Sequence, residues 1–142
     1  MPVPVERLSS LALFAESQLS PGELERIARS FEPKQASAGT VLTVEGAAGY
    51  SFFLIESGSV KVTREGEVLE ELGPGDFFGE AAILTGGRRN ATVTTSSDAT
   101  LLVLFGTEFR VLESELPATA ELIRRKMQER ADRADRESVS ET

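Results

Sequence analysis

The sequence predicts a mainly β fold, a jelly roll with flanking helices, and three observations lead to this prediction. Short apolar runs recur at a spacing of about ten residues between positions 41 and 105. Turn-forming residues, many of them glycine, separate these runs. Helical patterns precede and follow them. We therefore expect a single domain over residues 1–142, with two N-terminal helices, a β roll and two C-terminal helices.

The N-terminal helices are expected within residues 5–31. The first is indicated by apolar residues at near-helical spacing, namely Leu8, Leu11, Leu13 and Phe14. The second is expected to begin at the segment Ser20-Pro21-Gly22-Glu23, which is a capping box with proline at the first helical position.

The β roll is expected over residues 32–105, with one strand for each apolar run. The runs are Val41–Val44, Tyr50–Ile55, Val60–Val62, Val68–Leu72, Ala91–Thr95 and Leu101–Phe105. The turns between them are expected at Gly39, Glu45-Gly46, Ser57-Gly58, Glu65-Gly66 and Gly73-Pro74-Gly75-Asp76.

The C-terminal helices are expected over residues 107–136. Thr107 is a candidate N-cap for the first, which would continue through Leu112, and Pro117 can open the second. The second helix carries a narrow apolar stripe, formed by Ile123, Met127, Ala131 and Ala134. Pairs of opposite charge at i and i+4 also support it, namely Glu121/Arg125, Glu129/Arg133 and Asp132/Arg136. Residues 137–142 are expected to form a flexible tail.

The composition argues against an enzyme and against a metal site. The chain has 142 residues, of which 40% are hydrophobic, enough to bury the core of one domain. It contains no cysteine and no histidine, which removes thiol catalysis, disulfides, and the commonest general base and metal ligand. A β-barrel metal enzyme of the cupin kind would need a cluster of histidines. We therefore expect no catalytic residues and no metal.

Charge and hydropathy limit the partners. A net charge of −8 disfavours broad contact with nucleic acid or with anionic lipid. No stretch approaches the roughly 20 apolar residues of a membrane span, and the first residues lack the pattern of a signal peptide. We expect a cytoplasmic protein with no nucleic-acid or membrane partner, in which local donors would hold any anionic ligand.

One segment of the predicted roll carries the chemistry of a ribose-phosphate pocket. Residues 78–93 combine glycines with one carboxylate, Glu80, and a cation, Arg89. A carboxylate can accept a hydrogen bond from a sugar hydroxyl, and the planar guanidinium can donate two hydrogen bonds to a phosphate. The alternative is an ion pair that only ties two loops together, but surface pairs are worth about 0–1 kcal/mol and give little reason for a glycine-lined loop.

These elements and the segment FGEAAILTGGRRNATV resemble the cyclic nucleotide-binding domain family. The upstream run YSFFLIESGSVKV and the turn LGPGDFFGE stand in the order typical of that family, and the resemblance covers about residues 10–135. It implies a jelly roll with a phosphate-binding cassette at residues 78–93. It also implies cAMP or cGMP as the ligand, with no further cofactor.

The resemblance also implies which residues bind the ligand. Glu80 matches the carboxylate for the ribose 2′-hydroxyl, and Arg89 matches the phosphate arginine. Backbone N–H groups at the start of a short helix would point at the cyclic phosphate. Val62 and Leu72 fall where family members offer apolar side chains to the purine, and strand alternation places Val62 on the same face as Val60. The expected ligand-binding residues are Phe78, Gly79, Glu80, Ala81, Ala82, Arg89, Asn90, Ala91, Val62 and Leu72.

Two cassette positions depart from the usual family pattern. Many members have proline at the position of Arg88, and this arginine fits a solvated surface residue as well as a phosphate ligand. The position of Asn90 usually holds alanine, serine or threonine, and a hydroxyl there is associated with cGMP preference. Asparagine offers both a donor and an acceptor. We favour cAMP because the small single domain resembles bacterial members, with cGMP as the second choice and cyclic dinucleotides as a distant third.

The expected function is that of a stand-alone receiver. The resemblance implies that the last helix swings over the base as a lid, with its apolar stripe as the lid face. Ordinary packing of that stripe against the roll or a partner subunit is the alternative. Since residues 137–142 leave no room for an effector domain, occupancy would pass through the C-terminal helix to an effector protein or a homodimer partner. The rival function is a degenerate fold that serves as a protein-interaction module without a ligand.

Overall fold

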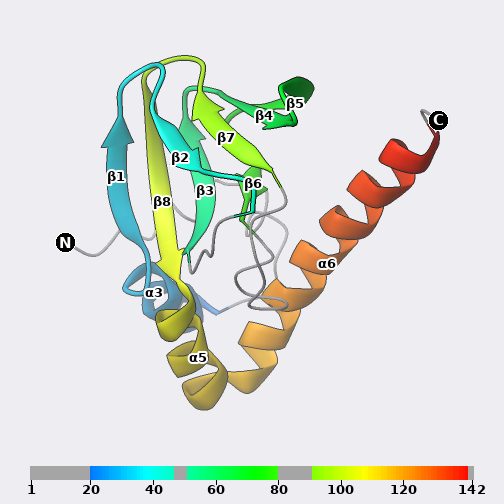
Figure 1. Cartoon of the computed structure of the whole chain (residues 1–142). Helices are drawn as coiled ribbons and strands as arrows, with labels where there is room; N and C mark the ends of the chain where they lie inside the picture. The colour runs from blue at the N-terminus through cyan, green and yellow to red at the C-terminus, as the bar shows by residue number, and fades with distance from the viewer. Residues whose placement is uncertain (1–19, 47–50, 80–90, 141–142) are drawn as a thin grey trace.

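The computed structural model describes residues 20–46, 51–79 and 91–140, with side chains up to residue 129. In this part of the chain, helices flank a mainly antiparallel β structure, which confirms the predicted fold class (Figure 1). The elements are α3 (Pro21–Ala28), β1 (Glu32–Ala36), β2 (Val41–Thr43), β3 (Ser51–Ser57), β4 (Val60–Arg64), β5 (Glu67–Leu72), β6 (Phe77–Phe78), β7 (Thr92–Thr95), β8 (Ala99–Phe105), α5 (Gly106–Glu115) and α6 (Pro117–Ser140).

The strands form two four-stranded sheets. Their orders are β1-β8-β3-β6 in the first sheet and β2-β7-β4-β5 in the second. All pairings within them are antiparallel. Figure 1 shows α3 and α5 at one end of the roll, with α6 leading away from α5 toward the C-terminus. No described helix is long and apolar enough to cross a membrane.

The central strands of the first sheet, β3 and β8, are buried on both faces, which explains their unbroken apolar runs. Alternation along β3 sends Phe52 and Leu54 toward the helices, and Phe53 and Ile55 toward the second sheet. Two hydrophobic clusters result. The helix-side cluster consists of Ile27, Ala28, Phe31, Phe52, Leu54, Phe77, Leu102, Leu104, Phe109, Leu112, Ala120, Ile123 and Met127. The inner cluster consists of Phe53, Ile55, Val60, Val62, Leu72, Phe78, Ala91, Val93, Ala99, Leu101 and Val103.

The capping box at Ser20 forms as the sequence predicts. Its hydroxyl accepts a hydrogen bond from the backbone N–H of Glu23 at 3.2 Å, and the Glu23 carboxylate accepts one from the backbone N–H of Ser20 at 3.2 Å. The hydroxyl of Thr119, on α6, also donates to Glu23. This bond, followed by the contacts with Ser20, holds the pKa of the Glu23 carboxyl below its usual range. The first of the two expected N-terminal helices, indicated by Leu8, Leu11, Leu13 and Phe14, lies outside the described residues.

The C-terminal helices differ from the prediction at three boundaries, one of which is the end of α5, at Glu115 where Leu112 was expected. Thr107 is not the N-cap of α5, because that helix begins at Gly106 after Phe105, and no side chain caps it. Helix α6 does begin at Pro117, but it continues to Ser140, so residues 137–140, which we expected in a flexible tail, are helical. The chain between residues 136 and 140 contains no proline or glycine that would stop the helix.

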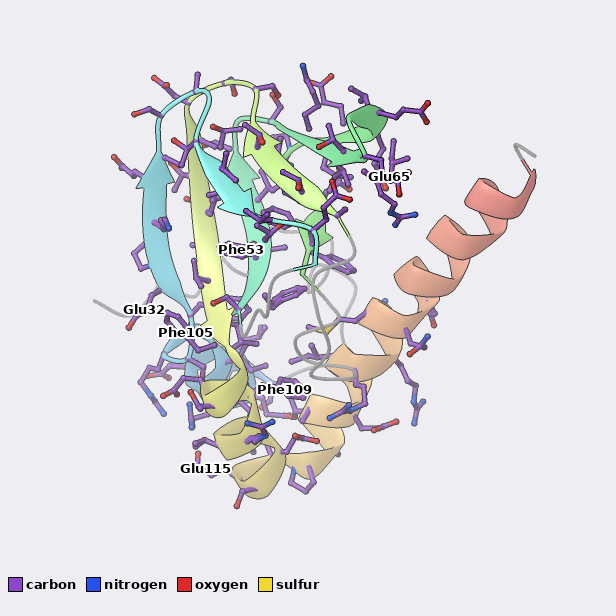
Figure 2. All side chains as sticks on the ribbon, viewed as in Figure 1. Glu32, Phe53, Glu65, Phe105, Phe109 and Glu115 are labelled. Carbon is purple, nitrogen blue, oxygen red and sulfur yellow. The ribbon has the colours of Figure 1, made fainter. Side chains whose placement is uncertain are left out.

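The first part of the apolar stripe on α6 packs against the roll. Ile123 and Met127 are fully buried in the helix-side cluster. Arg124 contacts α5 by an ion pair with Glu113 at 2.6 Å, and its guanidinium lies 5.3 Å from the ring centre of Phe109 (Figure 2). Of the two interpretations of this stripe, packing therefore holds for Ile123 and Met127. The side chains of Ala131 and Ala134 lie outside the described residues.

Strands β1 and β6 were not among the expected elements. Strand β1 has the sequence EPKQA and lies at the edge of the first sheet, mostly exposed, so it shows no apolar alternation. Strand β6 has only two residues, too few to show any period. The other strands match the six apolar runs to within about two residues at each end.

Candidate functional site

The apolar residues predicted to line the site come together in the inner cluster. Val62, Leu72, Phe78 and Ala91 are all buried there, although they come from four different segments. Val62 and Val60 share the inward face of β4, as predicted, and Val60 pairs with Leu72 on β5. These four side chains thus belong to one apolar cluster inside the roll.

The chain is firmly held where it approaches residue 80. Phe78 pairs with Phe53 in the sheet register, and their rings stack with centroids 4.8 Å apart and planes at 11° (Figure 2). Just before β6, Gly75 donates to the carbonyl of Ile55 and Ile55 donates to the carbonyl of Asp76, each at 2.8 Å. The Asp76 carboxylate accepts from the backbone N–H of Gly73 at 3.0 Å. The predicted turn therefore anchors β6 to β3.

Gly79 adopts a conformation that favours glycine. Its φ is +84°, in the left-handed region. A side chain there would cost about 1–2 kcal/mol. The glycine redirects the chain directly after the buried Phe78 and before Glu80, the position where a ligand-facing carboxylate is predicted.

The chain is equally well held where it returns from residue 90. The carbonyl of Ala91 accepts a hydrogen bond from the buried hydroxyl of Thr43 at 3.1 Å. The hydroxyl of Thr92 accepts one from the backbone N–H of Glu45 at 3.1 Å. Segment 80–90 thus connects β6 of the first sheet with β7 of the second, and residues of the inner cluster stand on both sides of it in the chain.

Five predicted site residues lie outside the described residues: Glu80, Ala81, Ala82, Arg89 and Asn90. Arg88 lies outside them as well. The ligand contacts assigned to these side chains and backbone groups stay predictions. The described members of the set are Phe78, Gly79, Ala91, Val62 and Leu72, and they border the segment that contains the others.

Sequence reasoning missed two residues that shape this site. Phe53 supports Phe78 by stacking, and Thr43 holds Ala91. The alternation of β3 could have placed Phe53 on the inner face, since Phe53 and Ile55 share it. No local pattern could have identified Thr43, because its contact joins residues 48 positions apart.

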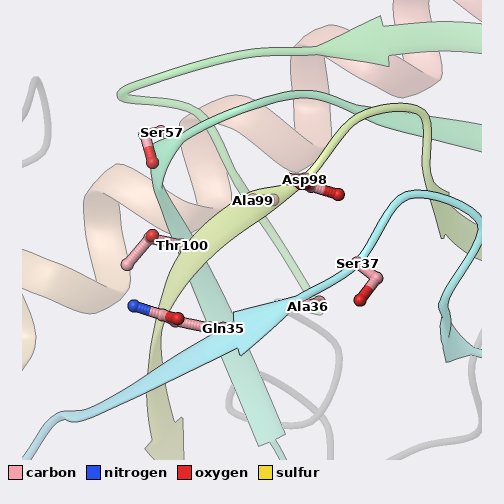
Figure 3. Close-up of a pocket in the computed structure, with 7 residues that line it drawn as sticks. All are labelled: Gln35, Ala36, Ser37, Ser57, Asp98, Ala99 and Thr100. Carbon is pink, nitrogen blue, oxygen red and sulfur yellow. The ribbon is translucent and has the colours of Figure 1, made fainter.

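A hollow of about 330 Å³ lies elsewhere, at the end of the roll away from the helices (Figure 3). It is lined by Gln35, Ala36, Ser37, Ser57, Asp98, Ala99 and Thr100. One oxygen of the Asp98 carboxylate already accepts a hydrogen bond from the backbone N–H of Ala38 at 2.9 Å. The hollow is open and lacks the apolar lining of the inner cluster, so we assign it no ligand. Among the described residues, no group of acidic, histidine or cysteine side chains could hold a metal ion.

Comparison with known proteins gives a consistent picture. The profile of the cyclic nucleotide-binding domain matches residues 33–115. A cyclic nucleotide-gated potassium channel of Rhizobium etli is 37% identical over 113 residues, which are 80% of this chain and 32% of the channel. The chain spans about a third of the length of two curated channels that it matches, this one and one of Mesorhizobium japonicum, with 32% and 31% of them covered.

Solved structures agree with the predicted fold. The regulatory domain of Toxoplasma gondii PKA, solved with cAMP, is 32% identical with a TM-score of 0.65, over 75% of this chain and 42% of that one. A cyclic nucleotide-binding domain from Methylobacillus flagellatus has a TM-score of 0.80 at 22% identity and covers 97% of this chain and 82% of its own. The second likeness concerns the fold alone.

Proposed function

The chain belongs to the cyclic nucleotide-binding domain family, and on this premise we propose that it binds a cyclic nucleotide, prefers cAMP to cGMP, and passes occupancy to a partner through α6. The observation that carries the proposal is the inner cluster. It gathers Val62, Leu72, Phe78 and Ala91 around the two ends of segment 80–90, which contains the predicted ribose and phosphate residues.

The proposed mode of binding divides the nucleotide between two surfaces. Val62 and Leu72 of the inner cluster would contact the purine. Burial of the purine is favourable because it removes apolar surface from water. Glu80 would accept a hydrogen bond from the ribose 2′-hydroxyl, and Arg89 would donate two to the cyclic phosphate. In a chain of net charge −8, such local donors are needed to hold an anion.

The proposed preference for cAMP is supported by a relative that was solved with this nucleotide and by the residue at position 90. The Toxoplasma gondii regulatory domain was solved with cAMP and is 32% identical to this chain. Asn90 lacks the hydroxyl that is associated with cGMP preference when a family member has serine or threonine at this position. We therefore propose cAMP as the ligand, with cGMP as the weaker alternative.

Transmission to α6 has a physical basis in strands β3 and β6. Each strand contributes one aromatic residue to each cluster. In the inner cluster the ring of Phe53 stacks on that of Phe78. In the helix-side cluster the ring centres of Phe52 and Phe77 lie 5.4 Å apart. Met127 of α6 belongs to the second of these clusters. A shift of β6 upon phosphate binding would therefore alter the packing beneath α6, and its partner would be an effector protein or a second copy of the chain.

Hydrogen exchange with and without cAMP tests this proposal. We expect altered protection in two places, the cassette at residues 78–93 and the helices at residues 108–136, because Phe77, which directly precedes the cassette, shares the helix-side cluster with Met127 of α6. The Arg89→Ala protein in the same concentration of cAMP serves as the control and should show neither change. Binding that alters the cassette alone would contradict transmission through α6.

A further inference from the structure

The end of β2 carries a buried hydroxyl whose position calls for an explanation. Thr43 is only 6% exposed. The register between β2 and β7 is irregular between Val41 and Thr43, and irregularities of this kind re-aim side chains. Here Thr43 is buried whereas Val41 is 54% exposed. The sheet thus turns a polar residue inward where an apolar one would cost less.

The Thr43 hydroxyl is directed at the residue where the chain leaves segment 80–90. It donates to the carbonyl of Ala91 at 3.1 Å, and both groups are buried. A buried carbonyl without a partner is costly, so this bond has a defined structural effect. It fixes the peptide group between Ala91 and Thr92.

Two residues later in the chain, Glu45 adds a second attachment. Its backbone N–H donates to the hydroxyl of Thr92 at 3.1 Å. Its carboxylate accepts from the backbone N–H of Glu65 with both oxygens, at 3.0 and 3.2 Å. Glu65 stands at the turn between β4 and β5 with a φ of 52°, a conformation that residues other than glycine seldom adopt (Figure 2).

We infer that Thr43 is a positioning residue for nucleotide binding, with Glu45 as its support. By holding Ala91, it sets the point from which Asn90 and the predicted phosphate ligand Arg89 extend, since these residues directly precede Ala91 in the chain. A phosphate contact depends on distance and direction to within a fraction of an ångström, so a loosened anchor would weaken it without any contact to the ligand. This inference rests on the proposed function.

The test uses three variants and three readouts. Thr43→Val keeps the volume and removes the hydroxyl, and Thr43→Ser restores a hydroxyl in a smaller side chain. Thr95→Val is the matched control. Thr95 is also buried and its hydroxyl donates to a backbone carbonyl, that of Ser37 at 2.6 Å, but it lies at the other end of β7. The two readouts of position are the Kd for cAMP and hydrogen exchange of residues 90–93 in the free protein, and the melting temperature reports separately on stability.

The expected results distinguish a change in the position of Ala91 from a general loss of protein stability. Thr43→Val should raise the Kd for cAMP by about tenfold, and Thr43→Ser should recover most of the loss. Thr95→Val should melt at a lower temperature yet bind within about twofold of wild type. Exchange at residues 90–93 should be faster in Thr43→Val than in wild type or Thr95→Val.

Two results would overturn the inference. One is wild-type affinity and wild-type exchange in Thr43→Val. The other is an equal loss of affinity in Thr95→Val, which would show a general effect of loosening β7. If wild type bound no cyclic nucleotide, the proposed function would fail instead. Exchange in the free protein would then still decide whether Thr43 fixes the start of β7, and unchanged exchange would refute it.

Discussion

Arg89→Ala is expected to lower the affinity for cAMP by about 100-fold or more, with little change in melting temperature. The reason is that a bidentate contact between guanidinium and phosphate comprises two charge-assisted hydrogen bonds, each worth about 1.5–3 kcal/mol. The two clusters that stabilise the fold consist of apolar residues from strands and helices, and removing a cation takes nothing from them. Calorimetric titration and thermal unfolding of the same preparation measure the two effects.

Arg88→Ala is the matched control for this prediction. It removes the same side chain from the adjacent position and changes the net charge by the same amount, so long-range electrostatics is held constant. If Arg89 alone binds the phosphate, Arg88→Ala should bind within about threefold of wild type. Similar losses in both variants would mean that the phosphate is held by the combined positive charge of Arg88 and Arg89 and not by one arginine.

Gly58→Ala is expected to destabilise the fold by about 2–4 kcal/mol, the largest stability effect that we predict. Gly58 has a φ of +86°, and a Cβ atom added to it would lie 2.3 Å from the carbonyl oxygen of Asp98 and 2.7 Å from Cα of Ala99. Both contacts are with backbone, which can yield only if the turn between β7 and β8 moves away. That turn is tied to Ser59 by hydrogen bonds of 3.0 Å with Ser96 and Ser97. Urea unfolding measures the loss.

Gly66→Ala separates the two contributions to this loss. Gly66 has a similar φ of +82°, but nothing lies within 4 Å of an added Cβ atom. Gly66→Ala should therefore lower the free energy of unfolding only by the cost of a side chain at positive φ, about 1–2 kcal/mol. An equal cost in both variants would mean that the steric contact of the added Cβ with Asp98 and Ala99 contributes nothing to the loss.

Much of the fold was predictable because its signals are local. The capping box at Ser20 fixed the start of α3, and Pro117 fixed the start of α6. Alternation correctly placed Val62 with Val60 on the inner face of β4. These features depend on residues within one turn or one strand of each other. Local sequence preferences therefore determine them, and the tertiary structure agrees with those preferences.

The features that escaped prediction depend on contacts between distant segments. Strand β1 is held by its pairing with β8, and its own polar sequence gives no indication of a strand. Thr107 has the chemistry of an N-cap, but the helix begins at Gly106, immediately after the last residue of β8. The role of Thr43 required the register of β2 against β7 to be known. At the site, the residue types could be read from the sequence, and alternation along β3 could have placed Phe53, but the anchor at Thr43 could not be predicted.

The most direct test of the central claim is calorimetric titration of the purified chain with cAMP and cGMP, after acid extraction to remove and identify any nucleotide that co-purifies. We predict binding of cAMP with a Kd in the micromolar range or below, about −8 kcal/mol or better, and weaker binding of cGMP. No heat with either nucleotide, together with an extract free of nucleotide, would contradict the claim that this domain is a cyclic nucleotide receiver.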